Sequence, residues 1–506
     1  MAKAERLPGG AAGREIRLEF EGERIAAREG EPIAVSLLAA GVDVFSRAVK
    51  YHRARGPFCL SGRCSHCVMR VDGEPNVFTC TTPARDGCKI ERQNAFPGVD
   101  LDVFRTIDWM YPRGLDHHTL FAGVPIVEKV VAKVARQMAG LGQLPDTARA
   151  DGARYLEHET DVVVIGGGSA GIAAALAARD SGVSVTLVDE QGALGGRLRT
   201  GLYGDDLPPL RSAARRDEAD GSSRSVTGGG NEDSARISGP TPGARTPAVS
   251  GAPVEDEPRH LDAERRAALV EAGVHVLSRT FAFGLYREDG LLVAARAPGR
   301  RLVVIRPKAV IVAAGATELL PPFANNDLPG VFAGRALARL VHADRVLPGK
   351  QIVVAGDDPA ERDRLAALLR YAGAEVVATP SLRGPDRILR ARGRSRVAGV
   401  ALANPAGGET RLRCDVIAVS GESSAFLDLA RHAGARVAWK GTGFAVIVDD
   451  HQGTGIPGVF ACGEVTGSCT PRESARQGAI AGRSASEHLR SRDESAPASR
   501  RLGGQP

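Results

Sequence analysis

Apolar and polar side chains alternate in short runs along the first part of the chain, with one helical stretch among them. Residues 14–20 alternate with the period of two that a half-buried strand requires. Residues 32–41 place apolar side chains at helical spacing and end on a glycine, which often closes a helix. Strand-like runs follow at 68–71 and 76–80. The pattern therefore predicts a small, mostly β domain.

Beyond residue 160 the pattern changes to apolar strands that alternate with helices. The stretch from Asp161 to Glu190 predicts a strand, a glycine turn, a helix and a second strand, and residues 351–378 repeat this order. Such alternation is typical of a parallel sheet with crossover helices. We expect two units of the nucleotide-binding type, and an α/β fold for this part of the chain.

Stretches that lack apolar periodicity separate these parts. Residues 213–258 are rich in Gly, Ser, Pro, Arg and acidic residues, so they cannot bury enough surface to offset their ordering entropy, and we expect a disordered insertion. The expected parts are a first domain 1–95, a connector 96–156 with a helix near 124–138, a first nucleotide-binding domain 157–345 that contains the insertion, a second nucleotide-type domain 346–443, a return to the first 444–490, and a disordered tail 491–506.

Composition narrows the class of protein. The net charge of +6 comes from scattered arginines and only 4% of residues are aromatic, which disfavours nucleic acid as a partner. No apolar run of about 20 residues predicts a membrane span, and the first residues lack the apolar core of a signal peptide. We therefore expect a cytoplasmic protein, in which eight cysteines would not form a disulfide framework.

Four of the cysteines are clustered in the first domain. Cys59 and Cys64 are separated by four residues, Cys67 follows after two more, and Cys80 after another twelve. This is the plant-type [2Fe–2S] spacing, and thiolates are soft ligands that suit iron–sulfur centres. Together with the strand pattern it predicts a ferredoxin-like β-grasp domain. A four-cysteine zinc site and unliganded thiols stay open as alternatives; Cys88 and His66 fall outside the predicted ligand set.

A glycine-rich turn opens the first nucleotide unit. Residues 166–171 read G-x-G-x-x-G after an apolar strand and before a helix, and Glu190 follows at the end of the next strand. This context predicts a dinucleotide site, with the pyrophosphate at the helix N-terminus and Glu190 accepting from the ribose hydroxyls. Alternation along the strand points Asp189 the other way.

Further motifs resemble flavoproteins with two dinucleotide-binding domains, of the pyridine nucleotide–disulfide oxidoreductase type. They are the Gly-Gly-Arg element at 195–197, residues 311–318, and residues 455–464, where Glu464 stands in place of the usual Asp. The likeness covers roughly residues 158–490 and implies FAD. The residues it assigns to the cofactor are Gly166, Gly168, Ser169, Ala170, Gly171, Glu190, Gly196, Arg197, Ala314, Gly315, Gly463 and Glu464.

Two features of that superfamily are missing. No cysteine lies in residues 197–203 and only Cys414 lies in residues 350–440, so the redox dithiol is absent and Cys462 and Cys469 are expected to be structural. In the second nucleotide unit Asp358 and Glu361 replace the second and third glycines of the fingerprint. Two carboxylates would repel a pyrophosphate, which disfavours NAD(P) although the fold is expected to be kept.

The order of the parts resembles a narrower family. Motifs at 51–57, 94–97 and 108–114 and the domain order are similar to the N-terminal part of the α subunit of heterotetrameric sarcosine oxidase. They also resemble the large subunits of opine oxidases, hydroxyproline dehydrogenases and hydrogen cyanide synthase. The chain departs from the sarcosine oxidase subunits by carrying the cluster cysteines and by ending near 506 without a folate-binding domain, so a folate-coupled activity is not expected.

The resemblance implies an FAD- and [2Fe–2S]-dependent oxidoreductase subunit that transfers electrons during oxidation of an amine or amino acid. A second FAD-containing, amine-oxidase-like subunit would bind the small-molecule amine, and electrons would pass from the flavin through the cluster. One alternative is a stand-alone NAD(P)H-dependent reductase that uses the cluster. Another is a non-enzymatic redox-sensing or scaffold subunit. We identify no catalytic acid or base, and we expect a surface or interface role for Asp116, His117 and His118.

Overall fold

The computed structural model describes residues 4–9, 13–49, 51–95, 98–105, 154–203, 258–299 and 301–495. Most of the expected connector lies outside these residues, with its helix and the Asp116 to His118 group. The expected insertion also lies outside, apart from Pro258, where helix α5 begins. None of the helices in the described part is long and apolar enough to cross a membrane.

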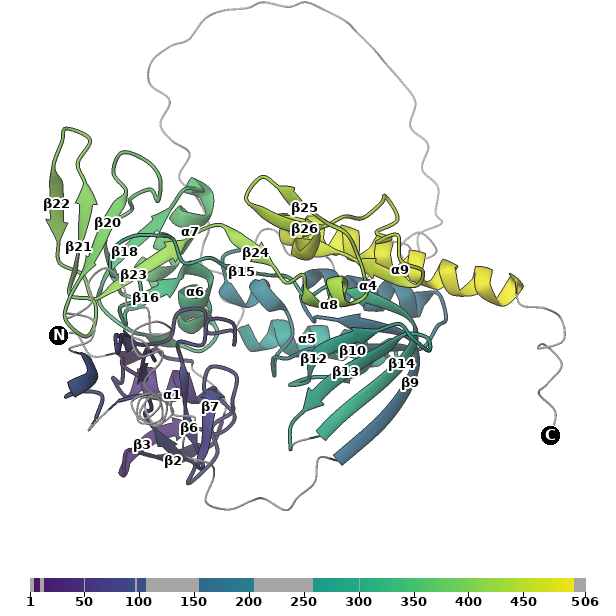
Figure 1. Cartoon of the computed structure of the whole chain (residues 1–506), viewed down its shortest axis with the longest axis horizontal. Coiled ribbons are helices and arrows are strands. Elements are labelled where there is room, and N and C mark those ends of the chain that lie inside the picture. Colours follow the sequence, from purple (N-terminus) through teal and green to yellow (C-terminus); the bar gives the residue numbers. More distant parts are fainter. Residues whose placement is uncertain are drawn as a thin grey trace, which may run out of the picture.

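The first domain is built on a five-stranded sheet with the order β3-β2-β8-β6-β7 (purple in Figure 1). Its elements are β2 (Glu15–Phe20), β3 (Glu23–Arg28), α1 (Ile33–Ala39), β6 (Val68–Val71), β7 (Glu74–Phe78) and β8 (Lys89–Glu91). Strands β2 and β3 form a hairpin, and β2 pairs in parallel with β8. Helix α1 buries Ile33, Leu37 and Leu38 against this sheet. The predicted ferredoxin-like β-grasp is confirmed.

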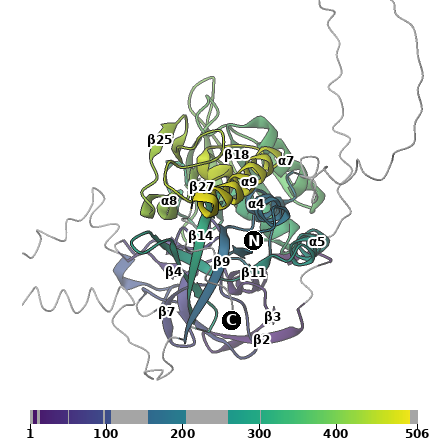
Figure 2. The ribbon, with the colours of Figure 1, turned by 90° about the vertical axis from the view of Figure 1, so that its right-hand side faces the viewer.

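The second sheet has seven strands in the order β11-β10-β9-β14-β13-β12, with β27 paired to β14. The strands are β9 (Arg154–Ile165), β10 (Val185–Val188), β11 (His275–Leu277), β12 (Phe281–Tyr286), β13 (Leu292–Ala297), β14 (Arg301–Val312) and β27 (Val459–Ala461). The helices are α4 (Ser169–Asp180), α5 (Pro258–Glu271), α8 (Asp428–His432) and α9 (Pro471–Ser495). Figure 2 shows α9 beside α4 over β14 and β27. Helix α9 extends past the expected start of the tail at residue 491.

The second nucleotide unit is a parallel sheet with the order β16-β23-β18-β19. It contains β16 (Val331–Ala333), α6 (Gly334–His342), β18 (Gln351–Gly356), α7 (Pro359–Tyr371), β19 (Glu375–Ala378) and β23 (Val416–Ser420). Because β16 pairs with β23, this unit begins before the expected boundary at residue 346. The chain has returned to the first nucleotide-binding domain by α8, which packs against β12, and therefore before the expected residue 444.

Short strands complete the fold. A three-stranded sheet joins β20 (Ile388–Arg392), β21 (Gly399–Ala403) and β22 (Glu409–Leu412). Two-stranded pairs join β15 (Ala316–Glu318) to β24 (Ser423–Ala425), β25 (Val437–Lys440) to β26 (Gly443–Val446), and β4 (Ser46–Arg47) to β5 (Ala54–Arg55). Single-turn 3₁₀ helices are η1 (Val103–Arg105), η2 (Gly196–Thr200) and η5 (Gly463–Thr466).

The first domain packs directly on the second nucleotide unit. One continuous apolar core runs from Phe58 and Leu60 into Val331 and Phe332. Strand β1 (Glu5–Arg6) leaves the first domain and pairs with β17 (Val346–Leu347), and Arg55 forms an ion pair with Asp327 at 2.7 Å. A shared core is more rigid than a polar contact between separate domains, so the cysteine loop has a defined place relative to the nucleotide fold.

Candidate functional site

The four cysteines meet in one loop region of the first domain. Cys59, Cys64 and Cys67 lie between β5 and β6, and Cys80 follows β7. Cys59, Cys67 and Cys80 are buried, and Cys64 is half-buried. The burial limits the access of water to these thiols.

The thiols approach one another in two pairs. Hydrogen bonding with Cys64 lowers the pKa of the Cys59 thiol to about 5, and hydrogen bonding with Cys80 lowers the pKa of Cys67. Among the described residues no group of three or more His, Cys, Asp or Glu side chains is arranged around a single metal ion. Four thiols are the donor set that a cluster of two irons with two thiolates on each requires.

Backbone amides of the loop point at the sulfurs. Gly62 donates to Cys80 Sγ at 3.2 Å. The amides of Ser61 and Arg63 donate to Cys59 Sγ, each at 3.4 Å. Such donors stabilise negative charge on thiolate ligands and raise the reduction potential of a cluster. The loop thus fits a [2Fe–2S] centre in its donor set and in its amide groups.

The glycines of the first fingerprint are needed for different structural reasons. Gly166 has φ +110°, and a Cβ there would lie 2.2 Å from the carbonyl oxygen of Ala313. A Cβ on Gly171 would lie 1.8 Å from the carbonyl oxygen of Gly166, so only glycine lets α4 approach the turn. Nothing lies within 4 Å of a Cβ built on Gly168, which caps α4. This open space at a helix N-terminus suits a pyrophosphate.

The turn opens onto a cavity of about 210 Å³. Of the residues predicted for the cofactor, all but Gly171 line it, and Gly171 packs beneath it. The described residues that line it come from the cysteine loop and from both nucleotide units. They are Cys59 and Ser61 from the cysteine loop, Glu190 and Gln191 after β10, Arg197 and Arg199 from η2, Ala314 to Glu318 after β14, Arg335 and Arg339 from α6, Phe426 after β24, and Gly463 and Glu464 from η5.

Two carboxylates follow β10. Glu190 lines the cavity and accepts from Arg63 Nη2 of the cysteine loop at 2.9 Å. Burial raises the pKa of Glu190, and the Arg63 guanidinium opposes that rise. Asp189 also lines the cavity, contrary to the strand alternation, because the chain turns after Val188. Its carboxylate accepts from the Gly167 and Gln191 amides, and burial raises its pKa to about 6.

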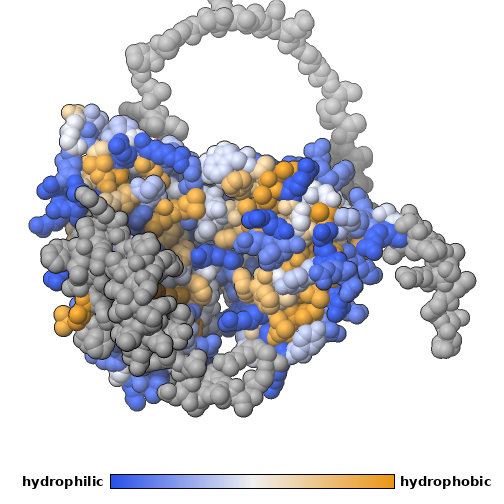
Figure 3. Space-filling model, viewed as in Figure 1, coloured by the Kyte–Doolittle hydropathy of each residue, from blue (hydrophilic) through white to orange (hydrophobic). Residues whose placement is uncertain are grey.

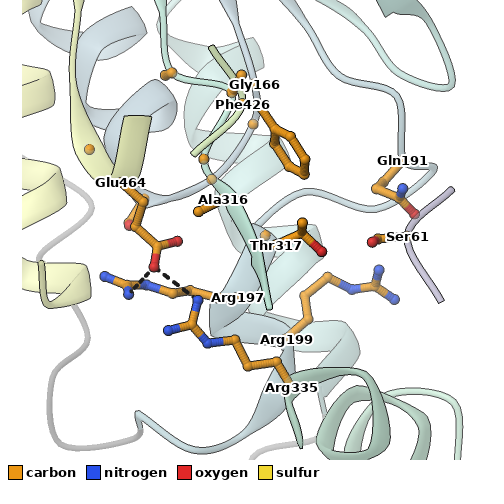
Figure 4. Close-up of a pocket in the computed structure, with 18 of the residues that line it drawn as sticks. Ser61, Gly166, Gln191, Arg197, Arg199, Ala316, Thr317, Arg335, Phe426 and Glu464 are labelled. Atoms are coloured by element: carbon orange, nitrogen blue, oxygen red, sulfur yellow. Dashed lines mark hydrogen bonds and ion pairs between the residues drawn. The ribbon is translucent and has the colours of Figure 1, made fainter. Parts of the chain in front are cut away.

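A buried charge network lies at the other end of the cavity (Figure 4). Glu464 Oε1 accepts from Arg197 at 2.8 Å and from Arg335 at 2.9 Å. Arg335 also donates to Glu361 at 3.0 Å, and its backbone amide donates to Glu318 at 2.8 Å. Charges this buried are stable only when paired, so the network fixes the wall of the cavity.

Glu318 is the least compensated member of this network. It is 6% exposed, and burial raises the pKa of its carboxyl to about 8. Arg335 opposes that rise, while the negative charges of Glu361 and Glu464 add to it. Among the described residues Glu318 Oε1 has no hydrogen-bond partner.

The carboxylates at the second fingerprint accept hydrogen bonds from other groups of this chain. Asp358 caps α7 by accepting from the amide of Ala360 at 2.9 Å, and Asp357 accepts from Leu382 at 2.7 Å. Glu361 turns toward the first nucleotide site, where it accepts from Arg335 and from Tyr203 at 3.2 Å. The carboxylates that we predicted to repel a phosphate therefore hold the helix end and the cavity wall.

Four further side chains were not predicted to bind a cofactor, and each is buried or half-buried: Cys462, Cys469, Cys88 and His66. Cys462 is buried, and Cys469 Sγ lies 3.1 Å from Ser474 Oγ. Cys88 is buried, and burial raises the pKa of its thiol to about 11. His66 is half-buried, and burial with the nearby Arg55 lowers the pKa of its imidazole to about 4.

We did not predict Arg63, Arg335 or Phe426 from the sequence, and we gave no separate role to Glu318, the last residue of the 311–318 motif. No motif marks Phe426 or Arg335, because both reach the cavity only through tertiary packing. Arg63 carries one signal in the sequence: it is the only Lys or Arg between Cys59 and Cys67, and it stands next to Cys64.

The fold and the site define an FAD-dependent oxidoreductase that also carries a [2Fe–2S] cluster domain. Residues 13–95 match the family model described as 2Fe-2S iron-sulfur cluster binding domain. Residues 161–322 match the one described as FAD dependent oxidoreductase. These matches decide against the zinc and free-thiol alternatives, so the cofactors of the chain are FAD and [2Fe–2S].

The chain is similar to sarcosine oxidase subunit alpha of Rhizobium meliloti (strain 1021), with 26% identity over 92% of this chain and 46% of the relative. The same subunit of Corynebacterium sp. (strain P-1) is 24% identical over 72% of this chain and 30% of the relative. The chain thus spans less than half the length of these relatives. The predicted resemblance to sarcosine oxidase α subunits is confirmed.

Two further comparisons cover other shares of the chain. Hydrogen cyanide synthase subunit HcnA of Pseudomonas aeruginosa (strain PAO1) is 30% identical over 80 residues, which are 16% of this chain and 76% of that protein. The crystal structure of L-proline dehydrogenase from P. horikoshii has the same fold, with a TM-score of 0.63 and 20% identity over 94% of this chain and 74% of that chain.

Proposed function

We propose that the chain is the electron-transferring subunit of a dehydrogenase or oxidase that acts on an amine or amino acid. The observation that carries the proposal is the shared cavity. Cys59 and Ser61 of the cysteine loop line the same space as Gly168 and Glu190 of the FAD fingerprint. When bound, FAD supplies two-electron chemistry and the cluster supplies one-electron chemistry. Cofactor sites that share a wall favour electron transfer between them.

The proposal assigns roles to this chain's own residues. The thiolates of Cys59, Cys64, Cys67 and Cys80 hold the irons. The N-terminus of α4 and the open space at Gly168 hold the pyrophosphate, and Glu190 accepts from the ribose hydroxyls. Arg197 and Arg335 hold Glu464, and these three side chains form the polar wall at the far end of the cavity.

A second, FAD-containing subunit is proposed to bind the amine. The sarcosine oxidase relatives are subunits by name, which supports an assembly of more than one chain. Figure 3 shows apolar surface over β12 and β13, where Phe281, Phe283 and Tyr286 are exposed. Edge strand β12 therefore offers a surface that a second subunit could cover. A cytoplasmic location is part of the same proposal.

The alternative of a stand-alone NAD(P)H-dependent reductase has less support. An NAD(P) pyrophosphate would need the N-terminus of α7, and Asp358 already accepts there. Glu361 is likewise committed to Arg335 and Tyr203. The redox-sensing alternative has no observation of its own that favours it over electron transfer.

The test is an anaerobic screen of amines and amino acids with the co-purified partner and a one-electron dye acceptor. We expect an amine to bleach the flavin and NADH not to do so. Cys67→Ser should keep FAD and amine-driven bleaching but lose the cluster, and dye reduction should fall at least tenfold. Cys88→Ser, a buried cysteine of the same domain, is the matched control. Rapid bleaching by NADH with no response to any amine would overturn the proposal.

A further inference from the structure

Arg63 connects the cysteine loop to the nucleotide cavity. Its backbone amide donates to Cys59 Sγ at 3.4 Å, and the next residue is Cys64. Its side chain leaves the first domain, and Nη2 donates to Glu190 Oε1 at 2.9 Å. One residue therefore contacts a predicted cluster ligand through its backbone and a predicted FAD ligand through its side chain.

Aromatic rings hold the guanidinium in this position. Its carbon lies 4.0 Å from the ring centroid of Phe426 and 5.6 Å from that of Phe281. Phe426 lines the cavity. The Arg63 side chain is only 25% exposed, so water screens its charge weakly, and the stacking limits its rotamers.

The same positive charge acts on both sites. A cluster held by four thiolates is anionic and becomes more so on reduction, so a nearby guanidinium stabilises the reduced form. The guanidinium also orients the Glu190 carboxylate, the acceptor for the ribose of the nucleotide. A group that contributes to two binding or redox equilibria links them, and the linkage must be equal in both directions.

We propose that Arg63 couples the two cofactor sites, so that FAD occupancy of the cavity changes the reduction potential of the cluster through this side chain. The inference rests on the cofactor positions of the proposed function, and it adds a positioning residue and a coupling that those positions alone do not require. By reciprocity, the oxidation state of the cluster changes the affinity for FAD by the same factor.

The test is a mediated potentiometric titration of the cluster, followed by its EPR signal, in FAD-saturated and in deflavinated protein. Each cluster takes one electron from the mediator. We expect FAD removal to shift the midpoint potential by about 59 mV or more, which corresponds to a tenfold coupling for a one-electron couple. In Arg63→Gln the shift should fall to less than half. Iron and sulfide content establishes that the variant carries its cluster.

Arg55→Gln is the matched control. Arg55 is 24% exposed and also joins the first domain to the rest through Asp327, but it does not line the cavity. Its variant should keep the full shift. If Arg63→Gln loads no cluster, Glu190→Gln leaves the cysteine loop unchanged and should also reduce the shift to less than half.

The proposal is overturned if FAD removal leaves the potential of the natural protein unchanged, or if the shift persists in the variants of Arg63 and Glu190. No amine takes part in this experiment. A failure to find an amine substrate would therefore contradict the proposed function without affecting the coupling result.

Discussion

At the scale of single residues, the buried charged side chains around the cavity matter most for the proposed function. Glu464 is shared between Arg197 and Arg335, and its side chain is only 8% exposed. Removing one partner from such a group leaves an uncompensated charge, which costs about 3–5 kcal/mol. These side chains therefore set both the shape of the cavity and part of the stability of the chain.

Glu318 gives a prediction about pH. The carboxyl has an ordinary pKa of 4.5 and a folded pKa of about 8, so between these values the folded chain binds more protons than the unfolded chain. Its contribution to stability is fully present below pH 4.5 and is lost as the pH rises toward 8. The loss is at most about 1.4 kcal/mol per pH unit.

Thermal unfolding of the natural chain and Glu318→Gln at several pH values checks this. The natural chain should lose melting temperature relative to the variant as the pH rises from 5 to 8. A difference between the two that does not change with pH would mean that Glu318 does not titrate in this range.

At the scale of elements, the turn before α4 requires glycine at two positions for two different reasons. At Gly171 the space is filled by the carbonyl of Gly166, whereas at Gly168 the space is open toward the cavity. Gly168 has φ −79°, which alanine adopts without strain. The two positions therefore respond differently to the same added methyl group.

Gly168→Ala should fold with little change in the melting temperature of the deflavinated protein but bind FAD at least tenfold more weakly, because its methyl group occupies space that the ligand needs. Gly171→Ala should lose about 1–3 kcal/mol or more of stability through overpacking. Melting curves and a fluorescence titration with FAD measure both effects. An unchanged affinity of Gly168→Ala for FAD would contradict the assignment of the pyrophosphate to Gly168.

Elements that show a local sequence pattern were predictable, whereas the elements with which they pair were not. The strand, turn and helix at 161–180 follow from apolar periodicity and glycine spacing, and so do the β2–β3 hairpin and α1. The boundary of the second nucleotide unit was placed too late because β16 is a strand of three residues, recognised only by its pairing with β23. Strands β22 and β23 are only three residues apart in the sequence but belong to different sheets, which no local pattern indicates.

At the scale of the whole molecule, the sequence identified both cofactors but not their proximity. The cysteine spacing and the glycine fingerprint are local signals, whereas the shared cavity depends on how the first domain packs against the second nucleotide unit. That packing rests on Phe58, Leu60 and the β1–β17 pair, none of which belongs to a motif. Arg63 and Phe426 were missed for the same reason.

The packing also gives the second nucleotide unit a structural role. Its sheet supports the cysteine loop through a common core, α6 supplies Arg335 to the cavity wall, and α7 supplies Glu361, which pairs with Arg335. A unit that has lost its fingerprint can still position the FAD site and the cluster domain relative to each other. This explains why the fold is intact where the fingerprint is lost.

The most direct test of the account is a freeze-quench experiment on the purified assembly, mixed anaerobically with its amine. Visible absorbance follows the flavin, and EPR follows the reduced [2Fe–2S] cluster in the same samples. We expect the cluster signal to rise after the flavin bleaches, and Cys67→Ser to bleach without developing this signal. A flavin that is reduced by the amine while the intact cluster stays oxidised would contradict the central claim of electron transfer between the two cofactors.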